Sequence, residues 1–548
     1  MFQYCGKIRE KLSFSSTVFI FGITAYFAFV LNISFWRFVF RTVEIDSLGA
    51  VIFIISVPVV MFVLLYIIFN LIVVPYIAKP ALIFFLIGSS IANYLMSSYG
   101  IFIDSDMIRN AFETNTREAL DLVTFPGIVQ VVLTGIVPAG IVLFSTIRFK
   151  TFKQELFGRG LHVLAGLGIV GVFAAVSYKE YAAYGRNNRE VRKLVNTVNY
   201  VYAAVRYFQR QAAARRQFVT LDEQAKLIPF PDNHKTVLVF VLGETARAAN
   251  FSLYGYERQT NPLLSKQDIA AFRDVASCGT ATAVSVPCMF SHLTRSDFDV
   301  EDAKYTENLL DLLKRGGYDI LWLENDNGCK GVCDRVEVKD MIQQNNPKYC
   351  FKDYCHDEVM LGELKNKLDH ITTDTVIVLH TMGSHGPTYF NRYPEKFQVF
   401  KPTCDTADIQ NCSRESILNT YDNTIVYTDY IVNQAIELLK QYPDYESGLI
   451  YVSDHGESLG ENNIYLHGFP YGIAPKEQKE VPMVIWMSDV MKKEDHIDYL
   501  CLKKEAAEKS YAHDHLFHSL LGLLEVSSRT YLPELDLFHT CRTKELPF

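Results

Sequence analysis

The sequence predicts a protein in two parts: a multi-pass α-helical membrane domain followed by an α/β domain with a mostly parallel central sheet. Three observations predict it. Long apolar runs crowd the first third of the chain, ten of the 11 cysteines lie beyond them, and short β-branched strands alternate with helical stretches after about residue 230. At 548 residues the chain is too long for one compact domain.

Five apolar segments are long enough to span a bilayer, which takes about 20 residues of helix. The first four contain no charged residue, and the fifth is shorter and Gly-rich. Buried helices of a soluble core rarely run so far without a charge, and the first segment is too long for a cleaved signal peptide. The segments are Leu12–Trp36, Leu48–Ala78, Pro80–Ile103, Phe125–Ile147 and Leu161–Ser177.

Basic residues predict the orientation of these segments. They gather before the first segment and before the fifth, so the N-terminal tail and the loop before the fifth segment are expected in the cytoplasm. Five crossings then place everything after about Tyr178 on the outer side of the membrane. The residues are Lys7, Arg9, Lys11, Arg148, Lys150, Lys153 and Arg159.

The cysteines agree with this topology. Only Cys5 lies in the predicted cytoplasmic tail, whereas an even number lies in the predicted exterior, mostly in close pairs, as five disulfides in an oxidising compartment would. A zinc-thiolate site is the alternative, but the spacings are irregular. The expected pairs are Cys278 with Cys288, Cys329 with Cys333, Cys350 with Cys355, Cys404 with Cys412 and, by elimination, Cys501 with Cys541.

A segment rich in Arg and Tyr, residues 179–230, separates the membrane domain from the rest. It suits either helices that rest in the lipid interface or a plain linker helix with a solvated basic face. We therefore expect a transmembrane domain over 1–178, bridging helices over 179–230 and a catalytic domain over 231–548. The net charge of −8 argues against a nucleic-acid partner.

Polar residues follow the predicted strands of the last part. Ligands of α/β sheets gather at the carboxyl ends of the strands. The strand segments are TVLVFVLGE, DILWLEND, TVIVLHTMGSH, GLIYVSDHGE and VPMVIWM, and the polar residues at the ends of the first four are Glu244, Glu324, Asp326, His380, His385, Asp454 and His455.

Three of these side chains suit a zinc ion. Glu244 in GETAR and the pair Asp454 and His455 in SDHGE supply oxygen and nitrogen ligands, and a catalytic zinc site keeps a position for the reacting group. A threonine hydroxyl is a weak nucleophile unless a metal or a base activates it. The loop CGTAT could hold Thr280 or Thr282 against the metal, and a helix that begins there would turn its first amides toward a phosphate.

Five blocks of this sequence also resemble a known family. GETAR, SCGTATAVSVPCMFS, CKGVCDR, HTMGSHGPTY and SDHGESLGENNIYLHG are similar to the signature blocks of the bacterial lipid A phosphoethanolamine transferases, which include the mobile colistin-resistance enzymes. The resemblance covers nearly the whole chain. It implies a catalytic domain of the alkaline phosphatase and sulfatase superfamily.

The resemblance also implies roles for single residues. Glu244, Thr282, Asp454 and His455 would bind the catalytic zinc, and Thr282 would be the nucleophile. It places His385 and His467 at the phosphoryl group or at a second zinc, and Lys330 near the substrate.

The reaction implied by the resemblance uses two lipids. Phosphatidylethanolamine would give its phosphoethanolamine group to Thr282 and leave as diacylglycerol, with His385 or His467 as proton donor. A phosphate of lipid A would then take the group, which weakens attraction for polymyxin and other cationic peptides. We expect a monomer in the bacterial inner membrane, in contact with membrane lipids, with its catalytic domain in the periplasm.

Other functions stay open at this point. A transferase for an inner-core sugar of lipopolysaccharide, a phosphoglycerol transferase or a sulfatase would use a similar site. A sulfatase needs a Cys or Ser at the nucleophile position, where this chain has Thr282. A membrane-anchored binding protein on an inactive fold would lack a metal ligand, and none of the four is missing.

Overall fold

The computed structural model divides into two compact units, Met1–Ile108 with Val123–Tyr207, and Arg109–Leu122 with Phe208–Phe548. The basic tail residues Lys7, Arg9 and Lys11, as well as Cys5, lie outside the described residues, as do the expected domain junctions at 179 and 230–231. The structure describes residues 12–43, 45, 47–113, 122–178, 180–181, 184, 189–213, 217–228, 234–351, 354–461, 464–544 and 546.

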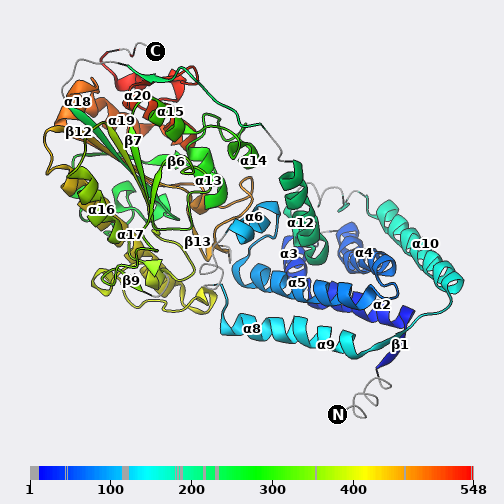
Figure 1. Cartoon of the computed structure of the whole chain (residues 1–548). Helices are drawn as coiled ribbons and strands as arrows, with labels where there is room; N and C mark the ends of the chain where they lie inside the picture. The colour runs from blue at the N-terminus through cyan, green and yellow to red at the C-terminus, as the bar shows by residue number, and fades with distance from the viewer. Residues whose placement is uncertain are drawn as a thin grey trace. The chain divides into compact units, whose positions relative to one another are not determined.

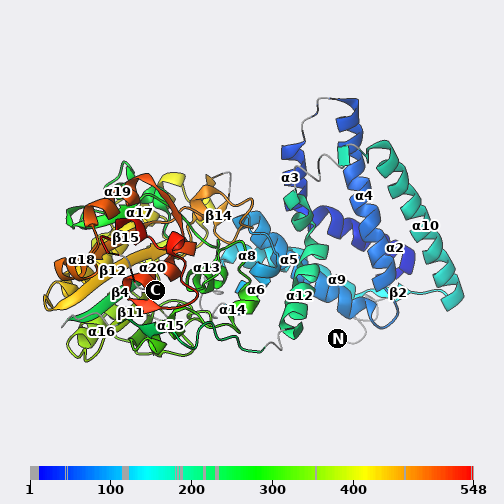
Figure 2. The same cartoon turned by 90° about the horizontal axis from the view of Figure 1, so that it is seen from above.

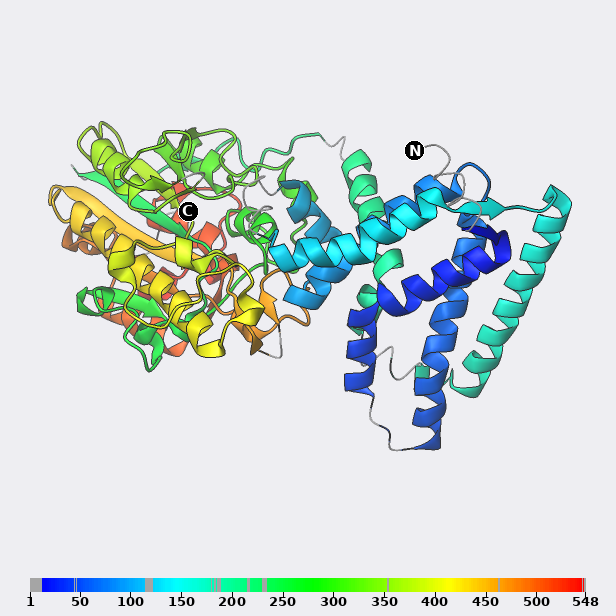
Figure 3. The same ribbon diagram turned by 90° about the horizontal axis from the view of Figure 1, so that it is seen from below.

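The first unit is a bundle of apolar helices. Four helices of its described residues are long and apolar enough to cross a membrane, and a bent pair makes a fifth if it counts as one span. Helix α4 packs against both α2 and α10 (Figures 2 and 3). The bent pair is α2 (Ser16–Ala25) with a π-helical turn (Tyr26–Val30) and α3 (Ile33–Thr42), and the others are α4 (Leu48–Ile72), α5 (Ala78–Tyr99), α8 to α9 (Phe125–Phe144) and α10 (Phe152–Val176).

The first predicted segment is not one straight helix. It bends by 55° between Val30 and Ile33. Asn32 lies at the bend, where its Nδ2 donates to the Phe27 carbonyl over 2.8 Å and its Oδ1 accepts from the Asn196 backbone N–H over 2.8 Å. A polar side chain that binds backbone groups in this way compensates for the broken helical ladder.

The fifth helix begins earlier than the apolar run that predicts it. It starts at Phe152 rather than Leu161, because the charged residues in between are good helix formers. Arg159 pairs with Glu155 over 2.9 Å, one turn apart, and also donates to the Asn70 carbonyl over 2.7 Å. Further along, α10 exposes a row of apolar side chains, as a lipid-facing helix does: Leu161, Leu164, Leu167, Val172 and Val176.

The segment expected to bridge the domains contains a 3₁₀ helix (Arg189–Leu194) and α12 (Asn196–Ala213). The start of α12 is buried in the first unit, where Asn196 Nδ2 donates to the carbonyls of Leu31 and Ser89 over 2.8 and 2.7 Å. Arg215 and Arg216 of the predicted basic face lie outside the described residues.

The second unit is built on a seven-stranded sheet, which confirms the predicted α/β fold (Figure 1). All neighbouring strands are parallel except β15, which runs antiparallel to both of its neighbours. From edge to edge the strands are β5 (Ile269–Phe272), β15 (Met483–Met487), β12 (Tyr445–Ser453), β4 (Lys235–Gly243), β11 (Thr375–His380), β7 (Asp319–Glu324) and β8 (Glu337–Asp340).

Helices cover both faces of this sheet. Leu238, Phe240 and Leu242 of β4 belong to one buried cluster with α15 (Leu309–Arg315), α19 (Tyr499–Glu508) and α20 (Leu516–Leu523). The helices α16 (Val359–Leu368) and α17 (Arg414–Leu439) lie against the other face (Figures 1 and 3). With both faces covered, the middle of each central strand is apolar, as in VLVFVL of β4 and VIVL of β11.

Candidate active site

The ends of four adjacent strands bring the predicted polar residues together. The order β12, β4, β11, β7 is parallel throughout, so the residues that follow these strands meet at one edge of the sheet. Glu244 follows β4 directly, and Asp454 and His455 follow β12. All three are at most 1% exposed.

Thr282 is the fourth member of this group. Its Oγ1 lies 3.1 Å from Glu244 Oε2 and 3.4 Å from His455 Nε2. His455 Nε2 in turn lies 3.4 Å from Asp454 Oδ2 and 3.5 Å from Glu244 Oε1. The four residues predicted to bind zinc therefore converge on one point, which we call the Thr282 group.

The two threonines of the CGTAT loop have different surroundings. Thr282 is the first residue of α13 (Thr282–Met289), whereas the Thr280 hydroxyl donates to the Phe469 carbonyl over 2.5 Å. The Thr280 carbonyl also accepts from the Gly468 N–H over 2.7 Å. Thr280 thus binds the neighbouring loop, and of the two hydroxyls only that of Thr282 has a hydrogen-bond partner in the group around Glu244.

The hydrogen bonds of the Thr282 group leave acceptor atoms free for a cation. His455 Nδ1 donates to the Gly456 carbonyl over 2.9 Å, which leaves the Nε2 lone pair directed at the carboxylates. Asp454 Oδ1 accepts from the backbone N–H groups of Thr245 and His455, but its buried Oδ2 has no hydrogen-bond partner among the described residues. Two carboxylates, an imidazole nitrogen and a hydroxyl fit a zinc ion.

The pKa shifts of the buried residues in the Thr282 group also favour a bound cation. Burial raises the pKa of Glu244, and burial raises the pKa of Asp454 to about 6, with repulsion from other carboxylates adding to both shifts. Burial also lowers the pKa of His455 to about 4. Buried carboxylates beside a neutral imidazole are costly unless a cation compensates them.

Comparison with known proteins places this architecture in a family. Residues 236–526 match the family model described as Sulfatase, and residues 61–212 match the one described as Phosphoethanolamine transferase EptA/EptB. The chain is 42% identical to phosphoethanolamine transferase EptA of Escherichia coli K12 over 540 residues, which cover 98% of this chain and 99% of that protein. The chain belongs to the EptA family of phosphoethanolamine transferases.

Two further phosphoethanolamine or phosphatidylethanolamine transferases are similar to nearly the whole chain. Phosphatidylethanolamine transferase Mcr-1 of Escherichia coli is 35% identical over 95% of this chain and 97% of its own length. The structure of the integral membrane lipooligosaccharide phosphoethanolamine transferase A of Neisseria meningitidis superposes with a TM-score of 0.94 at 38% identity, and covers 97% of this chain and 100% of its own. The resemblance seen in the sequence blocks is thereby confirmed.

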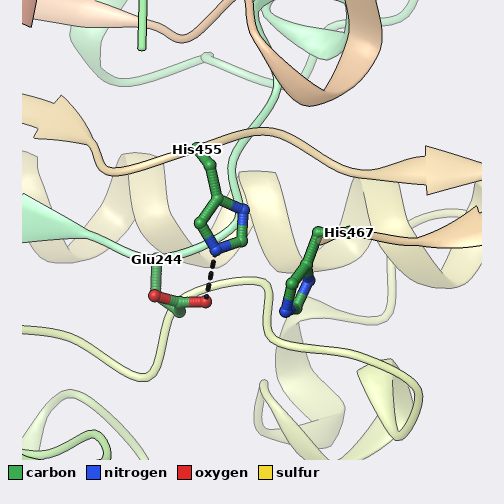
Figure 4. A group of neighbouring side chains, drawn as sticks. All are labelled: Glu244, His455 and His467. Carbon is green, nitrogen blue, oxygen red and sulfur yellow. Dashed lines mark ion pairs between the residues drawn. The ribbon is translucent and has the colours of Figure 1, made fainter. Parts of the chain in front are cut away.

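Two histidines lie beside the Thr282 group of this EptA-family chain. The ring centroids of His467 and His455 are 4.3 Å apart, and those of His467 and His385 are 5.5 Å apart. Glu244, His455 and His467 offer ligand atoms within 4.8 Å of one another (Figure 4). In Figure 4 a dashed line joins the His455 ring to the Glu244 carboxylate, and the His467 ring lies beside them.

The buried carboxyl group of Glu457 lies beside His467. Its Oε1 lies 3.3 Å from His467 Nδ1, and its Oε2 accepts from the Tyr389 hydroxyl over 3.0 Å. Burial raises the pKa of Glu457 to about 8. A buried carboxyl group therefore faces Nδ1 of the His467 ring.

Lys330 lies in the loop that follows β7. It follows β7 in a left-handed backbone conformation, with φ 54°, and its Nζ donates to the Asn327 carbonyl over 2.9 Å. It lines a cavity of about 60 Å³ beside Pro287 of α13. In the described residues no contact joins Lys330 to the Thr282 group, so its place near the substrate remains a prediction.

The predicted cysteine pairs are joined in the structure. The disulfides are Cys278–Cys288, Cys329–Cys333, Cys350–Cys355, Cys404–Cys412 and Cys501–Cys541. The first of them ties the loop that precedes Thr282 to the far end of α13.

Sequence reasoning missed one residue that supports the site. The buried His513 Nε2 donates to the Ser453 carbonyl over 3.0 Å, and its Nδ1 accepts from the Cys278 N–H over 3.1 Å. Ser285 Oγ lies 3.3 Å from the same nitrogen and donates to the Asp454 carbonyl over 2.5 Å. His513 thus joins the disulfide loop to the end of β12. No pattern near residue 513 signals this role, because its partners lie far away in the chain.

Proposed function

We propose that this chain transfers phosphoethanolamine from phosphatidylethanolamine to a phosphate group of lipid A, through a covalent intermediate on Thr282. The observation that carries the proposal is the contact of Thr282 Oγ1 with both Glu244 and His455. The names of two relatives support the substrates: Mcr-1 is a phosphatidylethanolamine transferase, and the Neisseria protein acts on a lipooligosaccharide.

Glu244, Thr282, Asp454 and His455 would hold one zinc ion. Zinc bound there would supply a Lewis acid that lowers the pKa of the Thr282 hydroxyl at neutral pH. The chain's own contribution is to fix the hydroxyl, since Thr282 is held at the start of α13 between Glu244 and the Cys278–Cys288 bridge. A β-branched side chain also has few rotamers, which limits the directions that its oxygen can take.

The first half-reaction moves the headgroup to the protein. Thr282 Oγ1 attacks the phosphorus of phosphatidylethanolamine, an O–P bond forms, and the bond from phosphorus to the diacylglycerol oxygen breaks. His385 or His467 gives the leaving oxygen its proton, and diacylglycerol departs. His467 suits this role because the Glu457 carboxyl group lies 3.3 Å from its Nδ1.

The second half-reaction regenerates Thr282. A phosphate oxygen of lipid A attacks the phosphorus of the phosphoethanolamine-threonine ester, and the O–P bond to Thr282 breaks. The added amine offsets part of the negative charge of lipid A, so cationic peptides such as polymyxin are attracted less. A second zinc at His385 and His467 during turnover, and Lys330 as a substrate contact, belong to the same proposal.

Both substrates are lipids, which suits the domain organisation. Residues 1–178 would span the bacterial inner membrane, residues 179–230 would bridge, and residues 231–548 would work in the periplasm as part of a monomer. The apolar helices of the first unit and the disulfides of the second support this assignment.

Mass spectrometry of lipid A tests the proposal. The full chain is produced in a strain that lacks phosphoethanolamine transferases of its own, with Thr282→Ala as the matched control. We expect lipid A with one added phosphoethanolamine on a phosphate only when Thr282 is present. Unmodified lipid A together with a modified core sugar would overturn the assignment of the acceptor. A phosphoglycerol product would overturn the assignment of the donor.

A further inference from the structure

A second group of buried potential ligands adjoins the Thr282 group. Glu244, Asp326 and His380 offer ligand atoms within 4.8 Å of one another. They are 1%, 3% and 0% exposed. Their positions follow from the sheet, since β4, β11 and β7 are neighbours: Glu244 follows β4, His380 ends β11 and Asp326 lies two residues beyond β7. Apart from Glu244, this group shares no residue with the Thr282 group.

Glu324 fixes the orientation of the His380 ring. Its Oε2 lies 2.9 Å from His380 Nδ1 and accepts from Trp322 Nε1, also over 2.9 Å. Its Oε1 accepts from the backbone N–H groups of Asp326 and Gly328 over 2.8 and 3.1 Å. With donors on both oxygens, Glu324 is an acceptor, so Nδ1 of the His380 ring carries a hydrogen.

The other ring nitrogen faces a carboxylate without a hydrogen bond between them. His380 Nε2 lies 3.7 Å from Asp326 Oδ2, and neither buried atom has a hydrogen-bond partner among the described residues. Two lone pairs that face each other in a buried site are unfavourable unless a metal ion or a proton lies between them. A histidine that binds a metal through one ring nitrogen usually donates the N–H of its other ring nitrogen to a carboxylate.

We propose that Glu244, Asp326 and His380 bind a second divalent transition-metal ion. Two carboxylates and an imidazole nitrogen suit Zn²⁺ or Mn²⁺. Glu324 is the positioning residue that directs His380 Nε2 toward this ion. The ion would also fix the Glu244 carboxylate, whose Oε2 contacts Thr282. This site differs from one at His385 and His467, with which it shares no residue.

Metal analysis of single variants separates the two sites. The full chain in detergent is stripped with a chelator, dialysed against Zn²⁺ and measured for zinc per protein. We expect Asp326→Asn and His380→Gln to lose one equivalent, Asp454→Asn to lose a different one, and the double variant Asp326→Asn with Asp454→Asn to lose both. His385→Gln is the matched control, and it should keep the equivalent that Asp326→Asn loses.

The possible outcomes decide between a metal and a proton. Equal zinc content in wild type, Asp326→Asn and His380→Gln would overturn the inference and leave a proton on His380 Nε2 in place of a metal. Loss of zinc in Asp454→Asn alone would keep the proposed function while rejecting the second ion. Because a core variant can misfold, anomalous diffraction from wild-type crystals soaked in Mn²⁺ provides an independent test: a peak between Asp326 and His380 is expected, and its absence beside an occupied Asp454 site contradicts the inference.

Discussion

Thr282 Oγ1 and Glu244 Oε2 lie 3.1 Å apart, although 38 residues separate them in the chain. The contact forms because β4 ends at the edge of the sheet where α13 begins. It sets a hydroxyl that would otherwise be a poor nucleophile against a buried carboxylate and an imidazole.

Substitution of the two loop threonines should have unequal effects. Thr282→Ala should abolish transfer, whereas Thr282→Ser keeps the hydroxyl and should retain reduced activity, because its rotamer is less restricted. Thr280→Ala is the matched control. It loses the hydrogen bond to Phe469, which contributes about 1 kcal/mol, and should leave most activity intact. Equal loss in Thr280→Ala and Thr282→Ala, measured by transfer assays on folded protein, would show that the loop matters only as a whole.

Two disulfides with similar loop lengths allow a matched comparison. Cys278–Cys288 and Cys404–Cys412 close 10 and 8 residues, so removing either by double Ser substitution should cost a similar free energy of unfolding, about 2–3 kcal/mol. Only the first adjoins Thr282. We expect kcat to fall clearly more without Cys278–Cys288, at equal loss of thermal stability. A parallel fall of kcat in both variants would contradict a positioning role for that bridge.

His513 should act through position rather than charge. His513→Leu removes both of its hydrogen bonds and leaves the Cys278 N–H and the Ser453 carbonyl buried without partners, at a cost of about 1–3 kcal/mol each. His513→Gln keeps one donor and one acceptor, so it should recover much of the stability and of kcat. If the Gln variant is as inactive as the Leu variant while fully folded, the ring itself has a further role.

Much of this molecule could be predicted from the sequence, because the signals were local. The charge-free runs predict the apolar helices, and the runs that end in GETAR and SDHGE predict the strands and the residues that follow them. The helix ends could not be predicted in this way: α10 begins at Phe152 because Arg159 and Glu155 pair along the helix. A charge-free run marks the apolar core of a span and not its termini.

The supporting residues of the site were beyond local signals. His513 contacts Cys278 across 235 residues, and Glu324 contacts His380 across 56. Whether an acidic residue after a strand binds a metal, holds a histidine or caps a turn depends on which strands become neighbours. That order, with β11 between β4 and β7, is a property of the whole sheet.

The stability of the second unit should depend on pH through Asp429. This α17 carboxylate accepts from the backbone N–H groups of Leu263 and Leu264 over 2.9 and 3.0 Å, yet burial raises its pKa to about 7. The unfolded value is about 3.9. A raised pKa in the folded state means that the stabilising effect of this group is lost as the pH rises toward 7.

Asp429→Asn removes that dependence. The variant loses one acceptor, so it should be less stable than wild type at pH 5. The difference in melting temperature between the two proteins should narrow as the pH rises from about 5 to 8. Melting temperatures of both full-length proteins in detergent measure the gap. A gap that stays constant, or widens with pH, would mean that Asp429 is ionised throughout this range.

The covalent intermediate on Thr282 is the central claim, and peptide mass spectrometry tests it most directly. The full-length protein is incubated with phosphatidylethanolamine in the absence of lipid A, digested, and compared with Thr282→Ala treated in the same way. We predict a phosphoethanolamine adduct on the peptide that contains residues 280–282, with fragmentation that assigns it to Thr282, and none in the variant. An adduct on Thr280 or a histidine, or diacylglycerol release without any adduct, would contradict the account.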